Sequence, residues 1–224
     1  MTDGLFDRIA PVYDRMNRIL SLGLDLAWRR KAARMLRAAP GAGAARSILD
    51  IASGTGDFAF ALARAFPRAA IRCADPSRAM LSAAAEKAAA RGLSGALEFS
   101  ECPASPMPFR AGAFDIAACA FGFRNFPDRA AAFSECARVL RPGGLLCVLE
   151  FTRLRPAAMA AVSCWLRAAS LLAFRHRADY AHLRRSICAM PRSEGFAEEA
   201  RAAGFETLRI RLLPPACTFF LFRR

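Results

Sequence analysis

Short apolar runs alternate with helical patterns through the first two thirds of the chain. The apolar runs occupy residues 46–51, 69–74, 96–100, 114–121 and 145–151. Helical patterns lie among them at residues 57–66, 77–91 and 129–140. Apolar strands that alternate with helices are typical of a parallel sheet that is covered on both faces. The order of the elements therefore predicts an α/β fold with helices on both faces of the sheet.

The two ends of the chain extend this pattern. Further helices are expected over residues 5–39, about 157–190 and 193–203, the first with a break near Gly23. Two β-like runs, 205–212 and 217–222, are joined by a connection so short that they must form an antiparallel hairpin. We therefore expect a mostly parallel sheet of seven strands with one antiparallel strand near the C-terminus. No linker divides the chain, so residues 1–224 are expected to form a single domain.

Composition is consistent with one packed domain and leaves the reason for its charge open. The 224 residues are 55% hydrophobic and 23% charged, which excludes a disordered chain. The net charge is +14, and only two of the 33 cationic residues, Lys31 and Lys87, are lysines. Such arginine enrichment reflects either genome composition or attraction to an anionic surface. The arginines are scattered and no basic, aromatic RNA-binding module is present, so we expect no nucleic-acid partner.

The sequence gives no sign of a metal centre or a secreted chain. Eight cysteines form no C-x-x-C pair and are interpreted as small buried hydrophobic residues in a reducing compartment. The two histidines, His176 and His182, are badly spaced for one helix face, so no metal is expected. Residues 157–174 carry a single charge, Arg167, which favours a buried or interfacial helix over a membrane span. We expect a cytoplasmic protein, with peripheral contact at the inner face of the membrane left open.

Ligand-binding features gather where the first predicted strand ends. The segment Leu49–Asp57 reads LDIASGTGD, with glycines at 54 and 56 that allow a tight turn and close approach of a ligand. In open α/β sheets, ligands bind beyond the carboxyl ends of the strands. A lone G-x-G motif is weak evidence for a particular ligand, because NAD, FAD and S-adenosylmethionine sites share it.

Two aspartates make the interpretation more specific. Asp50 directly precedes the glycine turn, where it could hold the cationic amino-acid end of S-adenosylmethionine and would repel a pyrophosphate. Asp75 ends the second predicted strand and could accept hydrogen bonds from ribose hydroxyls. The alternative is an ordinary turn with two aspartates that cap helices.

Several further motifs resemble one known family. They are YDRMN at 13–17, SLGL at 21–24, WR at 28–29, FGFRN at 121–125, RVLRPGG at 138–144 and LEF at 149–151. Together with Ala52 in the glycine turn, they resemble the signatures of the ubiquinone/menaquinone biosynthesis C-methyltransferases. The first and fourth motifs are the most specific of these. The resemblance is good over 13–151 and patchy afterwards.

The resemblance implies a Rossmann-like class I methyltransferase fold and S-adenosyl-L-methionine as the cofactor. It also implies methyl transfer to a ring carbon of a prenylated quinol. The implied cofactor-binding residues are Asp50, Gly54, Thr55, Gly56, Asp75, Pro76, Pro103, Ala104 and Ala120.

Arg124 and Asn125 are the implied catalytic residues. Arg124 would stabilise phenolate charge, because a guanidinium is always cationic and carries several donors. Asn125 would orient a water molecule or the substrate oxygen. The alternative for Arg124 is a structural ion pair with a nearby carboxylate such as Asp128.

Substrate contacts are implied on two helical segments. Tyr13 and Asn17 would lie on an N-terminal helical lid within residues 1–40, and Tyr180 would lie on a helical substrate wall over 151–192. The wall is apolar enough for a prenyl tail and a membrane surface, and Arg175 and Arg177 could contact anionic lipid. The alternative for both segments is ordinary packing against the sheet.

Some positions depart from the family pattern. Pro103 and Ala104 occupy positions beside the adenine where the family usually has a pair that begins with Asp or Asn. Ala120 replaces the usual serine, and His182 replaces a tyrosine. Asp25 occupies a position where the family commonly has histidine. These changes leave two alternatives, a methyltransferase of another small-molecule acceptor and a non-catalytic cofactor-binding relative. The sequence does not distinguish benzoquinol from naphthoquinol acceptors, and it gives neither the prenyl length nor the oligomeric state.

Overall fold

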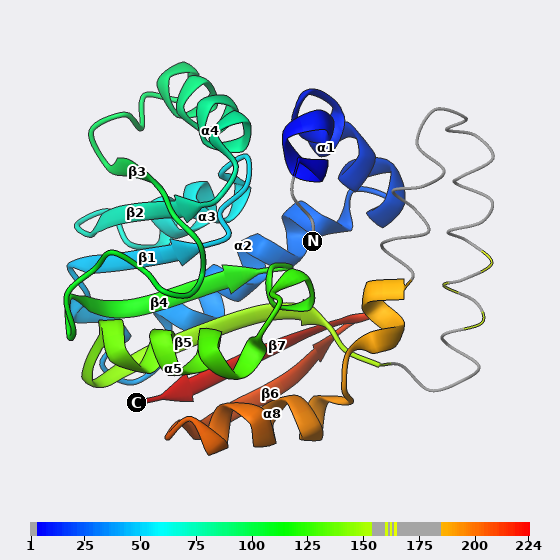
Figure 1. Ribbon diagram of the computed structural model, residues 1–224. Coiled ribbons are helices and arrows are strands. Elements are labelled where there is room, and N and C mark those ends of the chain that lie inside the picture. The colour runs from blue at the N-terminus through cyan, green and yellow to red at the C-terminus, as the bar shows by residue number, and fades with distance from the viewer. Residues whose placement is uncertain (1–3, 154–159, 161, 163, 165–184) are drawn as a thin grey trace.

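A single seven-stranded sheet organises the computed structural model, which describes residues 4–153, 160, 162, 164 and 185–224 (Figure 1). The strands lie in the order β3-β2-β1-β4-β5-β7-β6. Their bounds are Ser47–Ile51 (β1), Ala70–Asp75 (β2), Leu97–Glu101 (β3), Phe114–Ala120 (β4), Leu140–Phe151 (β5), Glu206–Leu213 (β6) and Cys217–Arg223 (β7). The predicted number of strands is confirmed.

Strand directions also follow the prediction. β1 pairs in parallel with β2 and β4, and further parallel pairs join β2 to β3 and β4 to β5. β7 is antiparallel to both of its neighbours, β5 and β6. The carboxyl ends of β1, β2 and β4 therefore meet at one edge of the sheet, on the side where the first helix lies (Figure 1).

Helices cover both faces of the sheet (Figure 1). Their bounds are Leu5–Ser21 (α1), Leu24–Arg37 (α2), Asp57–Ala65 (α3), Arg78–Ala90 (α4), Arg129–Val139 (α5) and Ser193–Ala202 (α8), with short 3₁₀ helices at Ala42–Ala44 (η1) and Phe123–Asn125 (η2). Leu36 of α2 and Leu62 of α3 are fully buried in one core cluster. Phe133 of α5 and Phe196 of α8 are buried in a second cluster with the other sheet face. Helices on both faces are thereby confirmed.

Local signals shape two helix ends, and the expected break near Gly23 is confirmed. The break between α1 and α2 occurs where Leu22 and Gly23 adopt left-handed conformations with φ of 52° and 77°. Ser77 caps α4, because its Oγ accepts a hydrogen bond from the backbone N–H of Met80 at 3.1 Å.

One predicted boundary is wrong. The strand was expected only over residues 145–151, but β5 already begins at Leu140 and runs through Pro142-Gly143-Gly144. Leu140 pairs with Phe114, and the register then shifts before Ile116 pairs with Leu145. The glycines are instead tied to the C-terminal residue: Gly143 N–H donates to the Arg224 carbonyl and Arg224 N–H donates to the Gly144 carbonyl. Pairing with Arg224, a non-local contact, carries the strand through this segment although Gly143 has a positive φ of 74°.

The cysteine interpretation is only partly right. Six of the eight cysteines are buried, as expected, but Cys164 and Cys188 are exposed, and all eight are free thiols. Most of the helix expected over 157–190 lies outside the described residues, and so does most of the wall proposed over 151–192. In the part of the chain that the structure describes, no helix is long and apolar enough to span a membrane.

Candidate active site

The glycine turn connects β1 to α3 in a conformation that needs small residues. Gly54 and Gly56 have φ of 52° and 85°, a region that side chains rarely adopt. A Cβ at Gly56 would also lie 2.9 Å from Cζ of Phe60. Gly56 therefore serves the turn itself, and it lines none of the three cavities described below. The backbone N–H of Gly54 points to Asp75, the last residue of β2.

Asp50 is a buried carboxylate without a protein partner. Its side chain is 1% exposed, and neither carboxylate oxygen has a hydrogen-bond partner in the described residues. It borders a small cavity that Arg29, Gly54 and Thr55 also line. Burial raises the pKa of Asp50 to about 8, with Asp75 adding to the rise and Arg29 opposing it. Unpaired oxygens at a cavity suit a ligand that brings its own positive charge.

Asp75 borders a second, larger cavity of about 320 Å³ along the carboxyl ends of the strands. Its Oδ2 accepts from the N–H of Gly54 at 2.8 Å, and its Oδ1 accepts from the N–H of Ser77 at 2.9 Å. Burial raises the pKa of this carboxyl as well, while the two backbone N–H groups favour its charged form. Each oxygen retains acceptor capacity for a hydroxyl group.

The structure brings together most of the predicted cofactor-binding residues. Those that line the larger cavity are Gly54, Asp75, Pro76, Pro103, Ala104 and Ala120. Asp50 and Thr55 border the small cavity instead, which shares Gly54 and Ala120 with the larger one. The hydroxyl of Thr55 already donates to Oδ1 of Asp14 at 2.6 Å.

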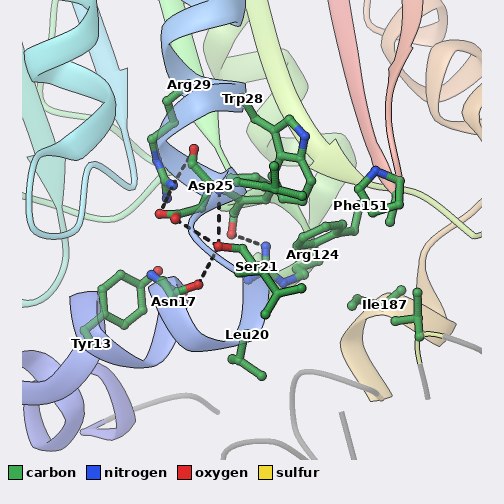
Figure 2. Close-up of a pocket in the computed structure, with 16 residues that line it drawn as sticks. Tyr13, Asn17, Leu20, Ser21, Asp25, Trp28, Arg29, Arg124, Phe151 and Ile187 are labelled. Atoms are coloured by element: carbon green, nitrogen blue, oxygen red, sulfur yellow. Dashed lines mark hydrogen bonds and ion pairs between the residues drawn. The ribbon is translucent and has the colours of Figure 1, made fainter. Parts of the chain in front are cut away.

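A third cavity of about 300 Å³ is lined mainly by apolar side chains (Figure 2). Three aromatic rings pack together in its wall. The ring centroids of Trp28 and Phe121 are 6.3 Å apart, those of Phe121 and Phe151 4.9 Å, and those of Trp28 and Phe151 5.9 Å. Tyr13 and Asn17, predicted to contact the substrate, also line this cavity. The third predicted substrate residue, Tyr180, lies outside the described residues.

Arg124 lines the same cavity and is held by a carboxylate that sequence reasoning missed. Its Nη1 donates to Oε1 of Glu150 at 2.9 Å, and its backbone N–H donates to Oε2 at 3.2 Å. Glu150 is fully buried near the end of β5. An ion pair was the structural alternative, but the expected partner, Asp128, instead caps α5 by accepting from the N–H of Ala131. The available signal was a glutamate in an otherwise apolar strand. Nε of Arg124 is buried and has no hydrogen-bond partner among the described residues.

Arg124 and Asn125 are neighbours in η2 but border different cavities. Arg124 lines the apolar cavity, whereas Asn125 lines the larger cavity beside Asp75. Phe121 lines both of these, and Tyr13 lines all three cavities. The site therefore consists of adjoining spaces that meet at Tyr13 and Phe121.

Ion pairs fasten α1 to the glycine turn and α4. Lys87 of α4 donates to Oδ2 of Asp14 in α1 at 2.6 Å and to Oδ1 of Asp57 in α3 at 2.9 Å. The two cations beside Asp57, Lys87 and Arg18, lower the pKa of that carboxyl against the opposing effect of burial. Sequence spacing did not suggest this network, because its members are far apart in the chain.

The network continues into the wall of the apolar cavity. Arg18 of α1 pairs with Asp57 and with Asp25 at the start of α2. Asp25 also accepts from Nη1 of Arg29 at 2.9 Å and has Ser21 Oγ 2.9 Å from its Oδ1. No group of three potential metal ligands occurs in the described part of the chain.

The strand order, the single reversed strand and the acidic residues at the glycine turn define a class I methyltransferase fold. The structure of a possible histamine N-methyltransferase from Thermotoga maritima aligns with a TM-score of 0.69 and 18% identity, covering 100% of this chain and 99% of that one. An O-methyltransferase family protein from Burkholderia thailandensis gives a TM-score of 0.68 at 20% identity, with 90% of this chain and 57% of that one covered.

Sequence comparison identifies the family. The model of the ubiE/COQ5 methyltransferase family matches residues 2–214. The demethylmenaquinone methyltransferase of Deinococcus radiodurans is 40% identical over 91% of this chain and 84% of its own length. The ubiquinone/menaquinone biosynthesis C-methyltransferase UbiE of Syntrophotalea carbinolica is 39% identical over 94% of this chain and 88% of its own. The chain belongs to the ubiE/COQ5 methyltransferase family, as the sequence motifs predicted.

Proposed function

We propose that this protein transfers a methyl group from S-adenosylmethionine to a ring carbon of a prenylated quinol in menaquinone or ubiquinone biosynthesis. The observation that carries the proposal is the meeting of a cofactor-sized cavity and an apolar aromatic cavity at Tyr13 and Phe121. Family membership and the names of the relatives support it. They do not favour another acceptor or a non-catalytic role, the two alternatives that the sequence left open.

The residues around the glycine turn suit S-adenosylmethionine. Asp50, whose oxygens have no hydrogen-bond partner among the described residues, would hold the ammonium group of the cofactor. Asp75 would accept from the ribose hydroxyls, and Pro103 and Ala104 would border the adenine. When bound, the cofactor supplies an electrophilic methyl group on a sulfonium.

The residues of the apolar cavity would prepare the acceptor ring. A quinol becomes nucleophilic at carbon as negative charge develops on its oxygen, so a fixed donor near that oxygen favours the reaction. Arg124 can provide this donor, with Glu150 fixing the position of its guanidinium. Phe121, Trp28 and Phe151 would flank the ring and exclude water.

We also propose roles for the parts of the chain around the site. All residues would act as one domain, with α1 as a lid whose Tyr13 and Asn17 face the acceptor. The apolar cavity would open toward an anionic membrane surface, where a prenyl tail resides. Exposed apolar side chains at the α1–α2 corner and the net charge of +14 support this orientation.

Methyl-transfer assays test the proposed reaction and the part played by Arg124. The protein is offered labelled S-adenosylmethionine with a prenylated demethylnaphthoquinol or a demethoxybenzoquinol in detergent. We expect turnover with at least one quinol, and the active quinol would assign the pathway. Because Arg124→Ala alone would leave Glu150 buried and unpaired, the variant is Arg124→Met combined with Glu150→Gln.

The double variant is expected to lower kcat by about 10²- to 10³-fold, the usual effect of losing one charge-stabilising donor. Glu150→Gln alone is the matched control and is expected to keep more activity, because the guanidinium remains. Both variants should bind S-adenosylmethionine as the wild type does. Cofactor binding without turnover on either quinol would contradict the proposed acceptor.

A further inference from the structure

The apolar cavity contains one carboxylate among the described residues that line it, Asp25. Its Oδ2 accepts from Arg18 and from Nη1 of Arg29, and Ser21 Oγ lies 2.9 Å from its Oδ1. An ionised carboxylate offers about four acceptor positions, so these three contacts within the described residues leave one position on Oδ1. Asp25 is buried, and water therefore supplies little of what this position requires.

A hydrogen-bond donor, Arg124, lines the same cavity as this acceptor. In Figure 2, Asp25 lies beside Arg29 and Ser21, and Arg124 lies between Ser21 and Phe151. The guanidinium of Arg124 can only donate hydrogen bonds, and an ionised Asp25 can only accept them. The cavity thus presents a donor and an acceptor to any flat ring held among its aromatic walls.

We propose that Asp25 selects the reduced quinol over the oxidised quinone by accepting a hydrogen bond from one ring hydroxyl. The inference rests on the proposed function, because it concerns the ring that the apolar cavity would hold. A quinol carries two O–H groups, whereas the corresponding quinone carries two carbonyl oxygens and no proton to donate. Arg124 can donate to an oxygen of either form, so the discrimination falls to Asp25.

The cost of the wrong ligand follows from burial. A quinone carbonyl placed against Asp25 brings acceptor lone pairs together and leaves a buried charge without its last partner. Sites built to hydrogen-bond a hydroxyl reject analogues that lack it far more strongly than sites that only fit a shape. Selection matters here, because only the reduced ring is nucleophilic and a bound quinone would block the cavity.

Equilibrium dialysis under anaerobic conditions measures the preference without requiring turnover. The ligands are a short-tailed 2-prenyl-1,4-naphthoquinol, kept reduced, and its quinone. We expect the wild type to bind the quinol at least about tenfold more tightly. Asp25→Asn, which matches the side chain in size, should weaken quinol binding about tenfold to a hundredfold, the usual effect of losing a hydrogen bond to a charged group. Quinone binding should stay the same or tighten.

Arg18→Gln is the matched control, because Arg18 pairs with the same carboxylate but does not line the cavity. It should retain the preference for the quinol, and thermal melting checks that each variant is folded. Equal losses of quinol and quinone binding in Asp25→Asn would overturn the inference and assign Asp25 a structural role. If the wild type methylates the quinol but Asp25→Asn still binds the quinol more tightly than the quinone, only this inference is overturned. A wild type that binds neither ring would contradict the proposed function as well.

Discussion

Asp50 is placed to couple cofactor binding to pH. A cationic amino group needs the ionised carboxylate, but the pKa of Asp50 in the free protein is about 8. Below pH 8, binding must first remove a proton, so affinity should fall about tenfold for each pH unit. Above pH 8, the α-amino group of the ligand itself loses its charge, since its pKa is about 7.7–8.0. Calorimetric titration should give the tightest binding near pH 8.

Replacing Asp50 should separate binding from stability. The pKa of Asp50 in the folded protein, about 8, lies above its value of about 3.9 in the unfolded chain. The free energy of unfolding is therefore highest at acid pH and falls as the pH rises toward 8. Asp50→Asn should therefore bind S-adenosylmethionine weakly, without the pH dependence, yet melt at a higher temperature than the wild type at pH 8.5. Each 1 kcal/mol corresponds to about 2–4 °C for a chain of this length.

Asp115 provides a contrasting carboxylate at the opposite edge of the sheet. Its Oδ2 accepts from the backbone N–H groups of Arg46 and Ser47, and these bonds and Arg141 lower its pKa against the effect of burial. Asp115→Asn should lower the melting temperature above about pH 4 and leave cofactor affinity unchanged.

A lower melting temperature for Asp50→Asn at pH 8.5 would contradict the assignment of Asp50 as an uncompensated charge.

At the scale of elements, the corner between α1 and α2 links the site to its surroundings. Leu22 is 71% exposed there, and its neighbours Ile19 and Leu24 are also exposed. Leu22 and Leu24 line the apolar cavity, so the corner lies where a tail would enter. Moving an exposed leucine from water into a lipid surface lowers the free energy, so a leucine at such an entrance favours membrane contact.

Co-sedimentation with vesicles containing anionic lipid tests the corner. Leu22→Ser should reduce the bound fraction, and the wild type should bind less at high salt, because its charge of +14 is then screened. Ile210→Ser is the matched control, since Ile210 is 40% exposed on the edge strand β6 and lines no cavity described above. Equal loss for both variants would contradict a specific role of the corner.

Sequence patterns predicted elements well where local signals decide them. The break at Gly23 follows from backbone conformation, and the cap of α4 follows from the Ser77 side chain. The boundary of β5 was wrong, because Gly143 pairs with Arg224, a contact that no local pattern carries. The partner of Arg124 was missed for the same reason, since Glu150 of β5 reaches Arg124 of η2 across 26 positions of the chain.

At the scale of the whole molecule, topology explains why the cofactor side was more predictable than the acceptor side. Parallel strands bring their carboxyl ends together, so residues after β1, β2 and β4 had to converge. Asp50, Asp75 and Ala120 do so around adjoining cavities. The acceptor side depends on how α1 and α2 pack over the sheet. Asp25 and Arg29 are spaced to pair within α2, but Asp25 joins the site through Arg18 of α1, a tertiary contact between two helices.

The position of the transferred methyl group tests the central proposal most directly. S-adenosylmethionine labelled with ¹³C in its methyl group would be incubated with the protein and the active prenylated quinol, and the product examined by ¹³C NMR. We expect the label as a methyl group bonded to a ring carbon, since in the proposed function Arg124 stabilises the phenolic oxygen while the ring carbon reacts. A label found on the quinol oxygen, or no transfer from bound cofactor, would contradict carbon methylation at this site.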